Sequence, residues 1–245
     1  MESPRNKIII FLFLFFSLNI AASDKADIYS AYVSNNMTKW KSVIDRIENT
    51  GNKDNNLLLE LVNYQYGYIA WCIGNNRNDE ARNYLEMAEK NLSVLEKEVK
   101  NLSLVNSYKA SFYGYRIGLN KLSAPFLGIK SIDAAKLAIS LDKNSAFAYV
   151  QYANIQFYMP AVFGGSKKEA VMYYLKALDI MEINESDKKE NWNYLSLLIV
   201  IAQSYLYLHD YTASLFYMEK IMKIEPEFGY VKNELYPQLL NKMKK

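Results

Sequence analysis

The feature that most constrains the fold is a pattern of two amphipathic helices that occurs four times along the chain. In each first helix, positions at offsets 0, +3, +4 and +7 fall on one face, and the +4 position is Gly or Ala. These faces are Asn63-Tyr66-Gly67-Ala70, Ala110-Tyr113-Gly114-Ile117, Tyr149-Tyr152-Ala153-Gln156 and Leu198-Ile201-Ala202-Tyr205. The second helices also carry small or compact residues at fixed spacing, as in Ala81-Leu85-Ala88. Because helices approach closely only where side chains are small, the pattern predicts stacked helical hairpins.

The composition favours an all-α protein. Of the 245 residues only 9 are Gly and 5 are Pro, while 51% are apolar, so we expect few turns and a packed core. The formal net charge is +3 and no block of Lys and Arg is present, which argues against nucleic acid as a partner. Hairpins are expected over residues 57–230. A capping helix or half repeat is expected over 24–56, and a C-terminal helix or tail over 231–245.

Residues 1–23 have the features of a secretory signal peptide. Arg5 and Lys7 precede an apolar run from Ile8 to about Ile20, and the small residues Ala21-Ala22-Ser23 follow. This order predicts an exported protein, either periplasmic or secreted. The alternative is an uncleaved membrane anchor, although the run is shorter than the roughly 20 apolar residues that a membrane span needs.

The two middle hairpins differ from the last one in their turns. The last hairpin uses 12 residues between its small facing positions (Ala202 to Ser214), whereas each middle hairpin uses 17, as from Gly114 to Ser131. The extra residues contain similar Pro…Gly…Ser sequences. Pro is expected to end the first helix, Gly to allow a left-handed turn, and Ser to cap the next helix. These rim residues, expected to pack over the edge of the stack or to line an opening, are Pro125, Phe126, Gly128, Pro160, Phe163, Gly164 and Gly165.

The last hairpin, residues 209–226, resembles a tetratricopeptide repeat in its second helix and in its closing Pro226. Residues 138–146 and 170–178 resemble the same repeat, and the likeness extends over about residues 57–230. The resemblance implies an all-α, right-handed α-α superhelix of four to five hairpins, as in exported bacterial members of that family. The chain departs from the pattern at Lys143 and Glu182, where the family has its closing proline.

A narrower resemblance involves residues 160–166 and the following Glu169-Ala170. They look like the Pro…Gly-Gly turn of periplasmic helical-repeat proteins, among them the tetratricopeptide component associated with tripartite (TRAP) solute transporters. That resemblance implies a solute-binding partner protein. In this alternative the hairpins enclose a small apolar ligand near Phe126, Phe163 and Tyr158.

A binding groove would be formed by first-helix residues beside the packing face. Tyr and Trp combine a large contact area with a hydrogen-bonding tip, and amides that match across repeats could hold a peptide backbone. The candidate groove residues are Tyr64, Tyr68, Trp71, Tyr108, Tyr115, Asn154, Phe157, Tyr158, Gln203 and Tyr207. For the aromatic members, closing the core of a short array is an equally good interpretation.

Side chains suited to catalysis are scarce. His209 is the only histidine and falls in a predicted hairpin turn, and Cys72 is the only cysteine and falls in an apolar helical run. A zinc site is therefore excluded, and no cofactor motif is present. We expect a non-enzymatic scaffold that binds a protein or peptide partner in the cell envelope. The solute-handling component is the alternative, and a hydrolase with an unrecognised carboxylate pair is the third hypothesis.

Overall fold

A computed structural model describes residues 24–98 and 102–244, so the predicted signal peptide lies outside the described residues. The described chain is all-helical and holds no strand, which confirms the prediction of an all-α protein. A helix over residues 24–33 comes first. It is followed by α2 (Met37–Glu48), α3 (Asn55–Gly74), α4 (Asn78–Glu98), α5 (Leu102–Leu119), α6 (Ala124–Leu141), α7 (Ala146–Tyr158), α8 (Lys167–Met181), α9 (Trp192–Tyr207), α10 (Tyr211–Ile224) and α11 (Tyr236–Met243). A π-helical turn, Val231–Leu235, leads directly into α11.

The helices pair as the sequence predicts: α3 with α4, α5 with α6, α7 with α8 and α9 with α10. Local capping explains several of the helix starts. Asp54, Ser166 and Asp210 each accept a hydrogen bond on the side chain from the backbone N–H three residues later. His209, with φ of 62°, occupies the left-handed position of the α9–α10 turn, as expected for a turn residue.

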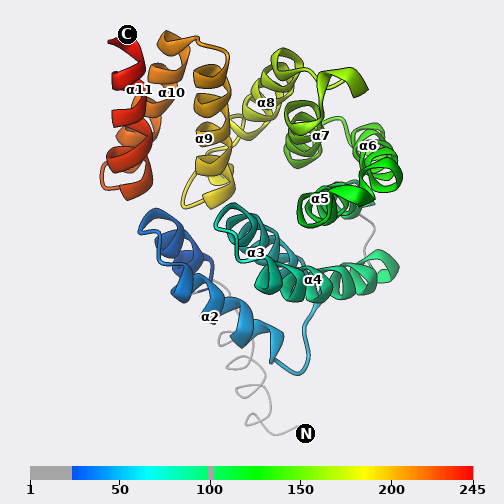
Figure 1. Cartoon of the computed structure of the whole chain (residues 1–245). Coiled ribbons are helices and arrows are strands. Elements are labelled where there is room, and N and C mark those ends of the chain that lie inside the picture. The colour runs from blue at the N-terminus through cyan, green and yellow to red at the C-terminus, as the bar shows by residue number, and fades with distance from the viewer. Residues whose placement is uncertain (1–23, 99–101, 245) are drawn as a thin grey trace, which may run out of the picture.

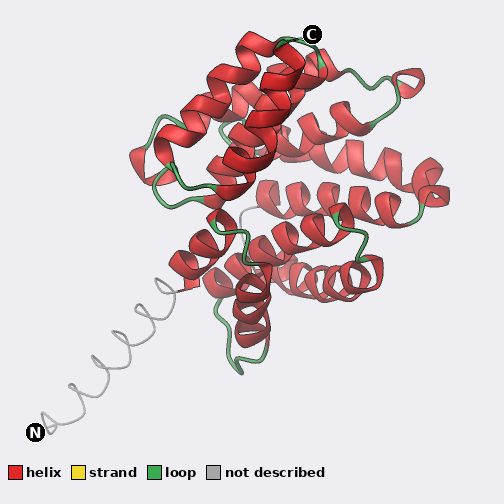
Figure 2. Ribbon diagram, turned by 60° about the vertical axis from the view of Figure 1, so that its left-hand side comes forward, coloured by secondary structure: helices red, strands yellow, loops and turns green. Residues whose placement is uncertain are grey.

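The hairpins follow an arc whose two ends meet. Figure 1 shows α2 on one side of the molecule facing α9 to α11, and Figure 2 shows successive helices stacked in layers. The Tyr29 hydroxyl donates a 2.5 Å hydrogen bond to the Glu225 carboxylate, and the Tyr32 ring lies 5.3 Å from that of Phe228. Two large buried cores result among the described residues, one around α2 to α5 and one around α7 to α11, and Tyr32 packs against both. A smaller cluster lies between α5 and α6.

The prediction of a turn insertion in the α5–α6 hairpin is wrong, because residues 124–131 belong to helix α6. Pro125 lies in the first turn of α6, where its missing N–H leaves no helical hydrogen bond unmade, and Gly128 lies within the same helix. The second insertion is a turn as predicted. Gly164 has φ of 94°, and a Cβ on Gly165 would lie 1.9 Å from the Met159 carbonyl oxygen, so only glycine fits there.

Candidate ligand cavity

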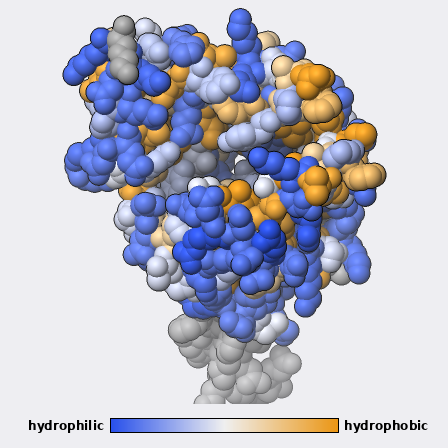
Figure 3. Space-filling model, viewed as in Figure 1, coloured by the Kyte–Doolittle hydropathy of each residue, from blue (hydrophilic) through white to orange (hydrophobic). Residues whose placement is uncertain are grey.

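A cavity of about 460 Å³ lies on the concave side of the arc. Its wall comes mainly from the first helices of all four hairpins, together with the end of α8 and the α8–α9 connection. Figure 3 shows the middle of this face hollowed, with apolar side chains beside the hollow. The lining residues are Leu59, Glu60, Asn63, Tyr66, Leu104, Tyr108, Asn144, Ala146, Phe147, Val150, Asn154, Ile180, Met181, Asp187, Asn191, Asn193, Ser196, Leu197 and Val200.

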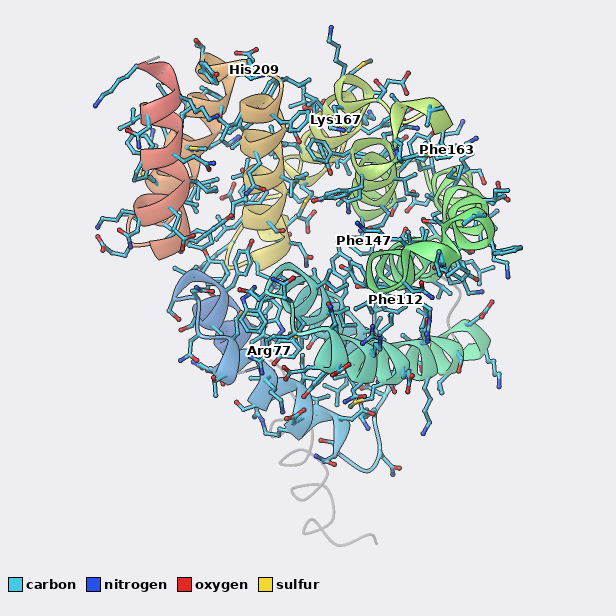
Figure 4. The ribbon with its side chains drawn as sticks, viewed as in Figure 1. Arg77, Phe112, Phe147, Phe163, Lys167 and His209 are labelled. Atoms are coloured by element: carbon cyan, nitrogen blue, oxygen red, sulfur yellow. The ribbon has the colours of Figure 1, made fainter. Side chains whose placement is uncertain are left out.

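Three aromatic rings form a connected part of the wall. The Tyr66 ring lies 6.0 Å from that of Tyr108 and 5.2 Å from that of Phe147, and the Tyr108 and Phe147 rings are 4.7 Å apart. Figure 4 shows Phe147 on the inner side of the arc, beside α5. The Tyr115 ring stacks on the Tyr66 ring, and the Tyr115 hydroxyl donates a 3.2 Å hydrogen bond to the Tyr66 backbone carbonyl. The rings are therefore held in place by several helices, as a preformed apolar site requires.

Five asparagines contribute side-chain amides to the wall. Asn193 donates a 3.3 Å hydrogen bond to Asn63, which joins α9 to α3 across the array. Asn154 accepts a 2.6 Å hydrogen bond from the Tyr174 hydroxyl and donates a 3.2 Å hydrogen bond to Gln151. Because these amides are fixed by protein partners, their remaining donors and acceptors have defined directions for a ligand.

The charged groups of the wall are both acidic. Glu60 and Asp187 line the cavity, and among the described residues no Lys or Arg lines it. Burial raises the pKa of the Glu60 carboxyl, and a 3.4 Å hydrogen bond from the Tyr64 hydroxyl opposes that rise. Asp187 accepts a 3.1 Å hydrogen bond from Asn184. The two carboxylates have separate hydrogen-bond partners, Tyr64 and Asn184.

Of the predicted groove residues, Tyr108 and Asn154 line the cavity. Tyr64 and Tyr68 are buried in the core, where Tyr68 donates a 2.8 Å hydrogen bond to Glu80. Tyr115 supports Tyr66, as described above, and Gln203 donates a 3.0 Å hydrogen bond to the Tyr230 hydroxyl.

The other predicted groove residues lie near the hairpin turns. Trp71 packs under the Arg77 guanidinium, whose central carbon is 5.2 Å from the ring centre. The Lys167 ammonium lies 5.2 Å from the Phe157 ring centre and 4.9 Å from that of Tyr207. Tyr158 is exposed. The predicted set is thus divided between cavity, core and turn edge.

The rim residues are outside the cavity. Phe126, Phe163 and Tyr158 are each about three-quarters exposed, so the enclosed apolar space is not between them but between α3, α5, α7 and α9. Among the cavity residues that the groove set omitted are Tyr66, Phe147, Asn63 and Asn193. Asn63 could have indicated the site, because it is a polar residue at the first position of a repeated packing face.

The described chain holds no candidate metal site and no candidate membrane span. In residues 24–98 and 102–244, no group of three or more His, Cys, Asp or Glu side chains is arranged to hold a metal ion. Within the same residues, no helix is long and apolar enough to cross a membrane.

The fold and the cavity define an all-α protein of stacked hairpins with a central hollow. No known family model matches the sequence, and no curated protein matches it either. Among solved structures, the HusA haemophore from Porphyromonas gingivalis is similar, with a TM-score of 0.55 and 20% sequence identity. The match covers 76% of this chain and 88% of the haemophore. At that identity the similarity concerns the fold.

Proposed function

We propose that this chain is an exported, non-enzymatic binding protein whose central cavity holds one small, largely apolar molecule that is neutral or cationic. The supporting observation is the composition of the cavity wall. Aromatic and aliphatic side chains cover most of it, several fixed amides supply directed hydrogen bonds, and its charged groups are the carboxylates of Glu60 and Asp187. Export is inferred from the apolar N-terminal segment of the sequence.

The closed arc favours a small ligand over the protein or peptide partner that the sequence suggests. A bound peptide needs a groove that is open at its ends, whereas here the helix over residues 24–33 contacts the segment that follows α10 through Tyr29 and Tyr32. A volume of about 460 Å³ also falls in the range of small-molecule sites.

The acidic side chains of the cavity wall disfavour haem as a ligand of this cavity, although the similar protein is a haemophore. Haem carries two carboxylates, and burying them next to Glu60 and Asp187, in a wall to which no described Lys or Arg contributes, would be unfavourable. Haem is therefore a comparison ligand in the test, and the proposal favours a ligand without acidic groups.

A matched pair of fluorescent dyes tests both parts of the proposal. N-phenylnaphthylamine is neutral, and anilinonaphthalene sulfonate has the same two ring systems with one added negative charge. We expect the neutral dye to bind with one-to-one stoichiometry and at least about tenfold more tightly than the sulfonate, a difference of about 1.4 kcal/mol. Haemin should compete weakly for the neutral dye.

Two sets of variants locate the dye. Val150→Trp places a large side chain in the cavity wall and should abolish dye binding, whereas Val94→Trp makes the same change on an exposed face of α4 and should not. Glu60→Gln with Asp187→Asn should reduce the preference for the neutral dye. If the neutral dye does not bind, or binds equally to both tryptophan variants, the cavity is not the binding site. If the sulfonate binds as tightly as the neutral dye, the charge argument is incorrect.

A further inference from the structure

The ends of two neighbouring hairpins carry exposed apolar side chains on a basic background. We call residues 120–132 and 157–168 the turn edge; they comprise the α5–α6 and α7–α8 turns with the helix ends beside them. Its large exposed apolar side chains, each 64–85% exposed, are Leu122, Phe126, Ile129, Tyr158, Val162 and Phe163. Figure 3 shows apolar side chains gathered on this side of the molecule, and Figure 4 shows Phe163 at its outer end.

The first helices run in the same direction, so their turns collect at one edge of the molecule. Tyr108, near the start of α5, contacts Phe147 at the start of α7, with ring centres 4.7 Å apart. Phe157 and Tyr207, both in the last turns of their helices, contact each other at 5.7 Å. The α5–α6 turn therefore lies on the same side as the α7–α8 turn, and a flat partner could contact both.

All the charged side chains of the turn edge are basic. Its charged residues are Lys121, Lys130, Lys167 and Lys168, and the first carboxylates follow at Asp133 and Glu169. Among the described residues, Lys121, Lys130 and Lys168 make no ion pair. Lys167 donates a 3.1 Å hydrogen bond to the Phe157 carbonyl.

We propose that the turn edge docks on the surface of a lipid bilayer that contains anionic headgroups. Projecting apolar side chains among lysines suit an interface in which acyl chains lie beneath negative charge. A rigid protein partner would instead need a pocket that receives these side chains, and the exposed side chains are spread over the helix ends and turns of two hairpins. This docking is independent of the cavity and of the ligand proposed for it.

Vesicle flotation tests the proposal with residues 24–245. That segment contains both buried cores, and leaving out the apolar residues 8–20 removes a second source of membrane binding. The protein is mixed with vesicles made of equal parts of phosphatidylglycerol and phosphatidylcholine, or of phosphatidylcholine alone. We expect flotation with the anionic vesicles, reduced flotation with the neutral ones, and weaker binding as salt is raised.

Three variants of the exposed surface identify the face that binds. Phe126→Ser/Val162→Ser/Phe163→Ser should lower the partition coefficient about tenfold or more, and Lys121→Gln/Lys130→Gln/Lys168→Gln should remove the preference for anionic vesicles. The control Leu141→Ser/Phe216→Ser changes exposed apolar residues away from the turn edge and should bind like the parent. All variants should keep the parental melting temperature, because every altered side chain is exposed.

Three results would overturn the proposal. The first is that the parent protein does not float with anionic vesicles at low salt. The second is that the control variant loses as much binding as the turn-edge variant. In the third, sedimentation would show that the turn-edge substitutions dissociate a dimer and leave vesicle binding unchanged, which would assign the edge to a second copy of this chain.

Discussion

Substitution of two glycines at equivalent positions of the first helices tests how closely Trp40 and Trp192 pack against α3. Gly67 in α3 and Gly114 in α5 both occupy the +4 position of the repeated face. A Cβ on Gly67 would lie 2.7 Å from Trp40 Cζ2 and 2.7 Å from Trp192 Cη2, whereas a Cβ on Gly114 would meet no atom within 4 Å. Gly67→Ala should therefore be less stable than Gly114→Ala.

The expected difference follows from two contributions. Exchange of Gly for Ala within a helix stabilises by about 1 kcal/mol, and this contribution is common to both variants. At Gly67 the new methyl group must also displace rings that are closer than the ordinary contact distance of 3.4–4 Å. Trp40 is 1% exposed and its Nε1 donates a 3.0 Å hydrogen bond to the Tyr64 carbonyl, so it has little freedom to move. Overpacking of this kind costs about 1–3 kcal/mol, which is the predicted difference between the two variants.

Thermal unfolding followed by circular dichroism measures that difference. For a chain of this size, about 2–4 °C per kcal/mol places the two midpoints roughly 2–12 °C apart. Gly114→Ala should unfold above the parent protein, and urea unfolding should give the same order of stability. A Gly67→Ala protein that is as stable as Gly114→Ala would refute the close packing of Trp40 and Trp192 on α3.

Three other predictions concern single polar groups. Tyr29→Phe removes the hydrogen bond to Glu225 that joins the two ends of the arc, and should lower the free energy of unfolding by about 1 kcal/mol in urea titrations, with faster amide exchange in the C-terminal helix. Burial raises the pKa of the Cys72 thiol to about 11, so a disulfide reagent at pH 8 should react with Cys72 only after unfolding; rapid reaction of the folded protein would contradict its placement in the core. Burial alone would raise the pKa of Glu182, but hydrogen bonds led by that from Lys220 hold this pKa below its usual value of 4.5. The stabilisation is therefore present above that pH and lost as the pH falls below it, and Glu182→Gln should lower stability at pH 7 and weaken its dependence on pH in the acid range.

Local features of the fold could be predicted from the sequence because their causes are local. The four hairpins follow from helix periodicity, and Ser166 caps α8 as its Ser-x-x-Glu sequence indicates. The facing positions were predicted correctly at Ala153 and Ala202, which are fully buried. Gly114, by contrast, is exposed.

The register of the second hairpin could not be read from residue size alone. Ser131 donates a 2.7 Å hydrogen bond to the carbonyl of Ala110, one turn before Gly114. In the last hairpin Ser214 donates the equivalent 2.8 Å bond to Ala202. Because the Pro125 insertion continues α6 instead of forming a loop, the facing position in α5 moves back by one turn, and the small side chain of Gly114 is not needed for packing.

The closing of the arc could not be predicted because it depends on contacts between the ends of the chain. The bond between Tyr29 and Glu225 spans 196 residues and leaves no periodic signal in the sequence. A repeat pattern specifies how neighbouring hairpins pack, but the curvature summed over four hairpins decides whether the first and last ones touch. The groove prediction also placed Tyr68 at the surface, whereas its ring packs on Tyr84 of the neighbouring helix α4.

One signal of the cavity was nevertheless present in the sequence. Asn63 begins a repeated face whose other members are expected to pack against a neighbouring helix, and burying an amide there without partners would be costly. In the structure Asn63 pairs with Asn193, and both line the cavity beside Tyr66. The polar side chain at the start of this repeat face thus marks a place where the face borders the cavity and pairs with another amide of its wall. Tyr66 likewise lines the cavity, although its position in the repeat is that of a packing residue.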